Sequence, residues 1–280
     1  MTNSNDNHSI TTQCQRYEGR VAIVTGGARG LGRVIARRLA EEGASVMIAD
    51  IDTAGAQRAA ETLAKELGDR FAWADGDLSQ PDVADAVVAK TIAKFGKVDT
   101  LVNNAAALIR MPITDFTEEL LQQAVNGNVW NTLRCCKAVI PHMTAQGYGR
   151  IVNIGGEAWR LGSPYHTVLG GVGKGSMVGL TATLAGEVVT KGVTVNCVSP
   201  GGINSADDGD PDKPASSSRD SSWNPPEVMA ALGNLRASNT SIGRVAHPSE
   251  VAAAVAFMGS PEASYVTGQH LGVSGGIAML

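Results

Sequence analysis

Short apolar runs rich in β-branched residues alternate along the chain with segments in which apolar residues recur every three or four positions. In one such segment Leu31, Ile35 and Leu39 fall four residues apart and charged residues fill the opposite face, which predicts an amphipathic helix. The apolar runs predict seven strands: Val21–Thr25, Ser45–Asp50, Phe71–Ala74, Val98–Asn103, Arg150–Ile154, Val193–Val198 and His270–Val273.

The alternation of strands and helices predicts the fold class. Strands that are apolar on both faces and separated by helices are typical of parallel sheets built from βαβ units. We therefore expect an α/β, doubly wound Rossmann-type fold: a single domain over residues 18–280, with a mostly parallel seven-stranded sheet and helices on both faces. The polar residues 1–17 are predicted to form a flexible tail without the apolar segment of a secretory signal.

A second polar stretch interrupts the pattern after the sixth strand. Its first half is rich in Asp, Ser and Pro, and a helical pattern follows at Pro225–Leu235. We expect residues 204–240 to form a mobile substrate loop, because the carboxyl ends of the strands are where such sheets bind ligands. The alternative is a solvated loop without a function.

Composition and charge exclude several kinds of partner. The formal net charge of −4 argues against a nucleic-acid partner, and no apolar run approaches the roughly 20 residues that cross a bilayer. The five histidines are scattered and the four cysteines form no CxxC pair, so neither a metal site nor a disulfide framework is predicted. These features favour a cytoplasmic protein that acts on a small molecule.

A glycine-rich turn follows the first strand and opens the first helix, with the sequence TGGARGLG from Thr25 to Gly32. Glycines let the backbone approach a pyrophosphate closely, and the N-terminus of a helix offers unpaired N–H groups to it. Asp50 ends the second strand, where a carboxylate accepts hydrogen bonds from the adenosine ribose and repels a 2′-phosphate. The pattern predicts NAD in preference to NADP, although Arg29 in the turn is a basic residue within reach of a 2′-phosphate.

These residues match one family in order and spacing, together with Asp77-Leu78, NNAA from Asn103, PGGINS from Pro200 and the late segment YVTGQHLGVSGG. From about Glu18 to Gly276 the chain resembles the short-chain dehydrogenases/reductases. The resemblance implies an NAD(H)-dependent oxidoreductase acting on a secondary alcohol or ketone. The cofactor-binding residues that it implies are Gly26, Arg29, Gly30, Leu31, Gly32, Asp50, Ile51, Asp77, Leu78, Asn104, Ala105, Lys174, Pro200, Gly201, Ile203 and Ser205.

The resemblance also implies a catalytic set, of which half is missing. The family moves the hydroxyl proton with a Tyr, a Lys four residues later, a Ser and an Asn. Lys174 matches the Lys and Asn128 matches the Asn. Gly170 stands where the Tyr is expected. Counting forward from the fifth strand places the Ser at Gly156, whereas counting back from Gly170 places it at Glu157, and both alignments remain open.

Three other residues are candidates for the proton transfer. Tyr165 and His166 lie just before Gly170, and Glu157 follows the fifth strand. An imidazole titrates near neutrality, a cation lowers the pKa of a phenol, and desolvation raises the pKa of a carboxyl group. Each of the three is otherwise a loop residue facing solvent or substrate, and Lys174 is otherwise a residue that only holds the nicotinamide ribose.

Three functions follow. The first is the dehydrogenase with a non-standard proton donor. The second is non-redox chemistry on the same fold, as in a lyase, isomerase or dehydratase. The third is a catalytically silent subunit of a hetero-oligomer with an active homologue. Trp130, Trp159 and Trp223 are candidates to line a substrate pocket, with Trp159 foremost.

Members of the family form dimers or tetramers, and we expect a homo-oligomer here. The helix after Lys174 carries Met177, Leu180, Leu184 and Val188 on one side, which predicts either a subunit interface or ordinary core. The apolar end of the chain from Gly276 is a second candidate interface.

Overall fold

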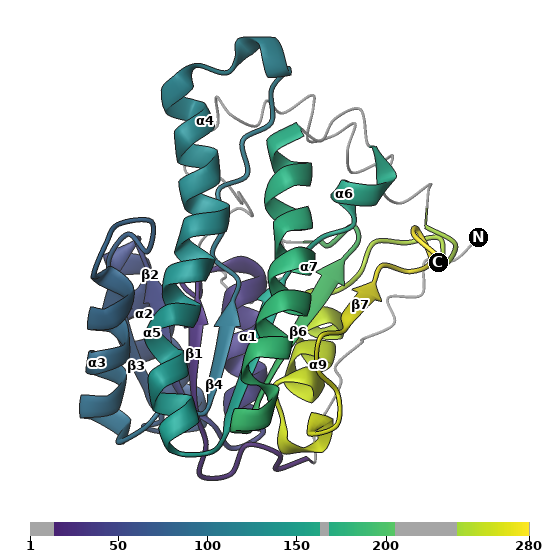
Figure 1. The fold of residues 1–280 in the computed structure, drawn as a ribbon. Coiled ribbons are helices and arrows are strands. Elements are labelled where there is room, and N and C mark those ends of the chain that lie inside the picture. The colour runs from purple at the N-terminus through teal and green to yellow at the C-terminus, as the bar shows by residue number, and fades with distance from the viewer. Residues whose placement is uncertain (1–13, 163–167, 205–239, 280) are drawn as a thin grey trace.

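The computed structural model describes residues 14–162, 168–204 and 240–279, and all seven predicted strands lie in one sheet (Figure 1). The strand order is β3-β2-β1-β4-β5-β6-β7, and every neighbouring pair is parallel. The predicted α/β doubly wound fold is confirmed. The strands are β1 (Val21–Thr25), β2 (Ser45–Asp50), β3 (Phe71–Asp75), β4 (Thr100–Asn103), β5 (Gly149–Ile154), β6 (Val193–Pro200) and β7 (His270–Val273).

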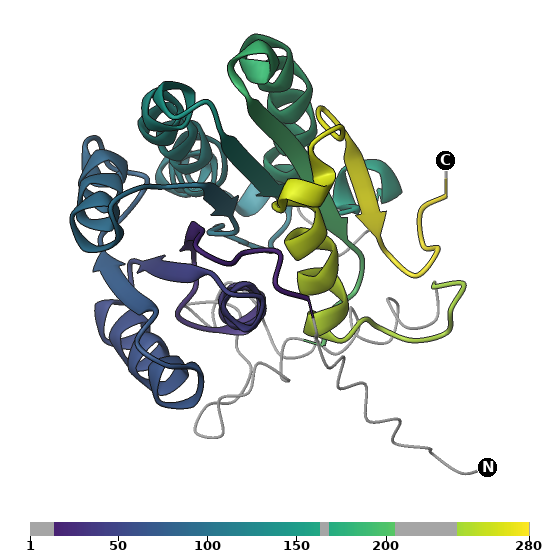
Figure 2. The same cartoon turned by 90° about the horizontal axis from the view of Figure 1, so that it is seen from below.

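Helices cover both faces of the sheet (Figures 1 and 2). One face packs against α1 (Gly30–Glu41), α2 (Thr53–Leu67) and α9 (Pro248–Met258). The other packs against α3 (Val83–Phe95), α5 (Asn131–Ala145) and α7 (Val168–Val188). Two further helices, α4 (Glu118–Val125) and the short α6 (Ala158–Leu161), extend beyond the carboxyl ends of the strands (Figure 1).

The strands read as continuous apolar runs because both of their faces are buried. In β1, Ala22 and Val24 pack on the side of α1, whereas Ile23 between them packs on the side of α3. Successive side chains of a strand point to opposite faces, so each must be apolar when helices cover both sides. This is the physical origin of the pattern from which the sheet is predicted.

The start of β4 differs from the prediction. It begins at Thr100, two residues later than expected. The reason is Asp99, whose carboxylate accepts the N–H of Val21 (2.9 Å) and pairs with Arg20 (3.1 Å). A side chain thus takes the place of a backbone carbonyl at this edge of the sheet.

The predicted boundary of the tail is also wrong at its end. Residues 1–13 lie outside the described residues, but Tyr17 is fully buried and its hydroxyl donates to the carbonyl of Ala256 (2.8 Å). Beside it, Arg16 pairs with the buried Glu42 (2.6 Å). The folded domain therefore begins before residue 17, because an aromatic ring fills a space between the start of β1 and α9.

The connections place the carboxyl ends of β1 and β4 side by side at the centre of the sheet, where the strand order reverses. Ligands of doubly wound folds bind in the crevice at such a point. Among the described residues, no helix is long and apolar enough to cross a membrane. Within the same residues, no three His, Cys, Asp or Glu side chains gather as metal ligands would.

Candidate cofactor and catalytic site

The turn between β1 and α1 needs glycine for steric reasons. A Cβ at Gly32 would lie 2.1 Å from the carbonyl oxygen of Gly26, and one at Gly26, where φ is +64°, would lie 2.9 Å from Cα of Ala105. Gly30 also has a positive φ, of +56°, but nothing within 4 Å of its Cβ position. The turn is therefore packed tightly on its inner side and open on its outer side, above the N-terminus of α1.

Asn104 holds this turn in place. Its amide nitrogen donates to the carbonyls of Thr25 and Gly26 (3.0 Å each). In return the hydroxyl of Thr25 accepts the backbone N–H groups of Asn104 and Ala105 (3.0 Å each). Sequence reasoning gave Thr25 no role; its position at the end of β1 was the available signal. The contacts show Asn104 bracing the backbone that would cradle a pyrophosphate.

Asp50 lies beside the glycine-rich turn. One oxygen of its carboxylate accepts the N–H of Ala28 (3.1 Å) and the other accepts the N–H of Asp52 (3.0 Å). Ile51 beside it is 36% exposed. The end of β2 thus presents a fixed carboxylate at the turn, which is the arrangement that a ribose diol requires.

Asp77, Leu78 and Leu31, which the resemblance also assigns to the cofactor, lie close to the core of the domain. Asp77 accepts the N–H of Ser79 (2.9 Å), and Leu78 is buried in the core on the side of α3. Leu31 packs against the opposite core. The Leu78 and Leu31 side chains therefore serve mainly as packing.

The segment after β6 is tied to the end of β7. The N–H of Gly201 donates to the carbonyl of Val273 (3.1 Å), and a Cβ on Gly201 would lie 3.0 Å from Cα of Ser274. Pro200 ends β6, and Ile203 forms a bridge with Ala246. These contacts hold the segment from Pro200 to Ile203 at the carboxyl ends of the strands, where the glycine-rich turn also lies.

Lys174 projects from α7 to the carboxyl end of β5. Its Nζ donates to the carbonyl of Ile154 (3.0 Å), and its Cγ would lie 3.4 Å from a Cβ at Gly156. Burial lowers the pKa of Lys174 to about 8, partly offset by the nearby thiol of Cys197. Gly156, not Glu157, is therefore the residue of this loop that faces Lys174.

Asn128 occupies a π-helical turn (Asn126–Trp130) between α4 and α5. It is 4% exposed, and its amide nitrogen donates to the carbonyls of Ala107 and Ala124 (2.7 Å each). A Cβ at Gly173 would lie 2.9 Å from Cβ of Asn128, so α7 passes directly over this turn. The structure thus brings Asn128 up to the helix that carries Lys174.

Glu157 points away from Lys174. It is 2% exposed, one oxygen pairs with Arg160 (2.6 Å), and the other has no hydrogen-bond partner in the described part of the chain. That second oxygen would lie 3.0 Å from a Cβ at Gly272 in β7. Its charge raises the pKa of His270, which burial lowers more strongly, and is not among the influences on the pKa of Lys174. Glu157 therefore neither pairs with Lys174 nor affects its pKa.

Comparison with known proteins identifies the family. Residues 26–278 match a family model described as enoyl-(acyl carrier protein) reductase. The chain is 38% identical over 270 residues to 2,3-dihydroxy-2,3-dihydro-p-cumate dehydrogenase of Pseudomonas putida, covering 94% of this chain and 96% of the relative. It is 35% identical over 263 residues to 1,6-dihydroxycyclohexa-2,4-diene-1-carboxylate dehydrogenase of Acinetobacter baylyi, covering 94% and 97%. The chain belongs to the short-chain dehydrogenase/reductase family.

A solved structure of this family has the same fold. The 3-oxoacyl-(acyl-carrier protein) reductase of Brucella melitensis with bound NAD superposes with a TM-score of 0.80 at 30% identity, covering 95% of this chain and 94% of that one. The relatives named above are all dehydrogenases or reductases, which supports an oxidoreductase of this family.

Two residues that sequence reasoning missed support the loop after β5 in this short-chain dehydrogenase/reductase. The hydroxyl of Ser199 accepts the N–H of Gly156 (3.0 Å) and lies 2.7 Å from Nε2 of His270. A Cβ at Gly155 would lie 2.3 Å from the same hydroxyl oxygen, so Ser199 occupies the space beneath that glycine. The signal was present in the sequence, since Ser199 directly follows one predicted strand and His270 begins another.

Trp159 lies in the same region, as expected of a residue bordering the site. Its ring is 40% exposed and meets the ring of His270 edge-on, with centroids 5.8 Å apart. Trp130 is 46% exposed. Tyr165, His166, Ser205 and Trp223 lie outside the described residues, as does most of the predicted substrate loop.

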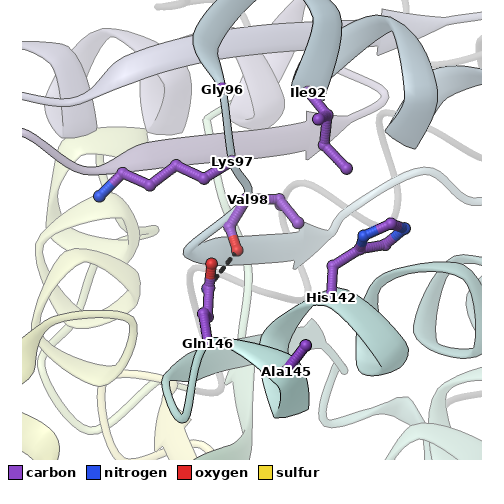
Figure 3. Close-up of a pocket in the computed structure, with 7 residues that line it drawn as sticks. All are labelled: Ile92, Gly96, Lys97, Val98, His142, Ala145 and Gln146. Atoms are coloured by element: carbon purple, nitrogen blue, oxygen red, sulfur yellow. Dashed lines mark hydrogen bonds between the residues drawn. The ribbon is translucent and has the colours of Figure 1, made fainter.

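A separate pocket of about 290 Å³ lies at the opposite edge of the sheet (Figure 3). Figure 3 shows Gln146 at the end of α5 reaching the carbonyl of Val98 (2.8 Å), with His142 and Lys97 nearby. None of its lining residues belongs to the candidate site.

Proposed function

We propose that this short-chain dehydrogenase/reductase is an NAD(H)-dependent oxidoreductase acting on a secondary alcohol or ketone. The observation that carries the proposal is the pairing of the glycine-rich turn with the carboxylate of Asp50, which accepts the N–H of Ala28 within that turn. The missing Tyr at Gly170 means that a different group moves the hydroxyl proton.

The residues present fit a dinucleotide. The space beside Gly30 is open, the inner side of the turn leaves no room for a Cβ at Gly32, and the first turn of α1 carries no acidic residue to repel a phosphate. Asp50 would hold the adenosine ribose, and the segment from Pro200 to Ile203 with Lys174 would hold the nicotinamide end. When bound, the nicotinamide supplies the acceptor or donor of the hydride.

The preference for NAD over NADP is tested by substitution of Asp50. Wild-type protein should bind NADH roughly tenfold or more tightly than NADPH, a difference of ~1.4 kcal/mol or more, because the carboxylate repels the 2′-phosphate. Asp50→Ala should remove most of that difference. Asp75→Ala is the matched control, since Asp75 is an exposed carboxylate at the end of the neighbouring strand.

Fluorescence titration with both nucleotides provides the measurement. A ratio unchanged by Asp50→Ala would contradict the assigned preference. Wild-type protein that binds neither nucleotide would contradict the oxidoreductase itself, and a copurifying homologue would then favour the silent subunit of a hetero-oligomer. Binding without turnover of any alcohol would instead favour non-redox chemistry.

For the substrate we propose a vicinal diol on an unsaturated carboxylated ring. The names of the Pseudomonas putida and Acinetobacter baylyi relatives support this class, as each describes a dehydrogenase of a dihydroxy ring compound. Production of NADH from a panel of ring diols, simple secondary alcohols and 3-hydroxyacyl thioesters tests it. Faster turnover of the thioesters than of every diol would overturn the proposed class.

We also propose that the protein is cytoplasmic and that it assembles as a homo-oligomer. On the predicted face of α7, Met177 and Val188 are buried and Leu180 and Leu184 are partly buried against the core, which favours the core interpretation for these four residues. The apolar end of the chain is the better candidate, since Met279 is 73% exposed. Light scattering of the wild type and Met279→Glu tests this: a wild-type monomer would refute the homo-oligomer, and an unchanged mass in the variant would refute its location.

A further inference from the structure

We propose that the amine of Lys174 itself takes the hydroxyl proton of the alcohol, in place of the family's Tyr. The inference rests on the proposed function and names the group that carries its proton transfer. It makes Lys174 a catalytic residue and not only a residue that holds the ribose.

The first argument is the space around Lys174. Its nitrogen reaches the carbonyl of Ile154 at the carboxyl end of β5, and its stem faces Gly156, which offers no side chain. A Cβ at Gly156 would lie 3.4 Å from Cγ of Lys174, which is close to ordinary van der Waals contact. The position therefore has room for a small side chain such as the family's serine, but it carries none. With glycine also at position 170, neither position at which the family places a hydroxyl group carries one, and Glu157 of the same loop is paired with Arg160.

The second argument is the lack of a charged partner. In the described part of the chain, Lys174 forms no ion pair, and one hydrogen bond to Ile154 leaves two of its ammonium protons unassigned. The titratable group beside it is the buried thiol of Cys197 from β6. Asn128 contacts α7 at Gly173, the residue before the lysine, and its amide is committed to two carbonyls. Glu157 is turned toward Arg160 and β7. A partly buried ammonium without a neighbouring carboxylate loses its proton more readily than one in water.

The third argument is that the resulting pKa of about 8 suits proton transfer. A general acid or base is most effective when its pKa lies near the working pH. During oxidation the O–H bond breaks, an N–H bond forms on the neutral amine, and the O–H electron pair becomes the second carbon–oxygen bond as the hydride leaves the same carbon. The ammonium then releases its proton to water.

Substitution of Lys174 tests the assignment. Lys174→Arg keeps the positive charge and hydrogen-bond donors but does not titrate near neutrality. We expect it to bind NADH within about threefold of the wild type and to lose about 10²-fold or more in kcat. Lys137→Arg, an exposed lysine on α5, is the matched control.

Chemical rescue separates proton transfer from ribose binding. Small primary amines added to Lys174→Ala should restore oxidation, and the rescue rate should depend on the pKa of the amine. Rescue that is independent of amine basicity, or a Lys174→Arg variant with the wild-type pH profile, would overturn the proposal. Loss of the pH dependence in Tyr165→Phe or His166→Gln would assign the proton transfer to that residue instead.

A measurement without turnover completes the test. Competitive labelling of amines across a pH series, followed by mass spectrometry, reports the titration of Lys174 in the NADH-bound protein. Titration near 8 is expected, whereas titration near the ordinary value of about 10.4 would overturn the inference. A wild-type protein that oxidises no alcohol would overturn the proposed function. A wild-type protein that oxidises alcohols but whose Lys174 titrates near 10.4 would overturn only the role of the lysine.

Discussion

Gly32→Ala is the most direct test of the cofactor turn. The added methyl group would lie 2.1 Å from the carbonyl oxygen of Gly26 and 2.5 Å from the amide nitrogen of Asn104. Carbon and carbonyl oxygen in contact are normally about 3.3 Å apart, so the turn must open by roughly 1 Å. Opening it breaks the two hydrogen bonds from Asn104 to the carbonyls of Thr25 and Gly26.

The cost follows from these contacts. Overpacking costs about 1–3 kcal/mol and each lost hydrogen bond about 1 kcal/mol, while alanine regains about 1 kcal/mol of helix propensity. We expect the free energy of unfolding to fall by about 2–4 kcal/mol, which lowers Tm by roughly 5–10 °C. NADH affinity should fall by about tenfold or more, since the displaced backbone is the proposed pyrophosphate cradle.

Denaturant titration and NADH fluorescence provide the two measurements, with Gly186→Ala as control. Gly186 lies on α7 with nothing within 4 Å of its Cβ position, so alanine should stabilise the helix by about 0.5–1 kcal/mol without changing NADH affinity. A Gly32→Ala protein with wild-type stability and affinity would refute the steric argument.

Two further predictions concern polar side chains outside the turn, Tyr17 and His270. Tyr17→Phe should lower the free energy of unfolding by about 1–2 kcal/mol with NADH affinity unchanged, because it leaves the buried carbonyl of Ala256 without the tyrosine hydroxyl; denaturation curves that coincide would contradict this. Burial lowers the pKa of His270, so the unfolded chain binds this proton more readily and stability contributed by His270 is lost as pH falls below about 6.5. His270→Gln should therefore lose less stability than the wild type between pH 7 and pH 5 in parallel denaturation series, and equal losses would contradict the assignment.

The sheet and the cofactor turn were predictable because their causes are local. A strand buried on both faces must be apolar throughout, and a Cβ at Gly32 is excluded by the carbonyl of Gly26 within the same turn. The end of β2 at Asp50 follows from the same periodicity. The sequence is sufficient where a residue type is dictated by its immediate neighbours.

The catalytic region was less predictable because its contacts join distant segments. The direction of the Glu157 side chain depends on Arg160 and on β7, which lies more than a hundred residues later. The anchoring of Gly156 by Ser199, and the burial of Tyr17 against α9, are likewise long-range contacts without a local pattern. Counting residues from either end of the loop could not decide which residue faces Lys174.

The π-helical turn at Asn126–Trp130 has a consequence for insertions and deletions. It joins α4 to α5 without a break and contains one residue more than an α-helical turn would use. Removing that residue would leave a continuous helix but rotate α4 by about 100° relative to α5, which is the rotation per residue of an α-helix. Asn128 would then lose its bonds to Ala107 and Ala124, and Gly173 would no longer face it. The length of this connection is therefore fixed by rotational phase, even though its helical hydrogen bonding would tolerate the deletion.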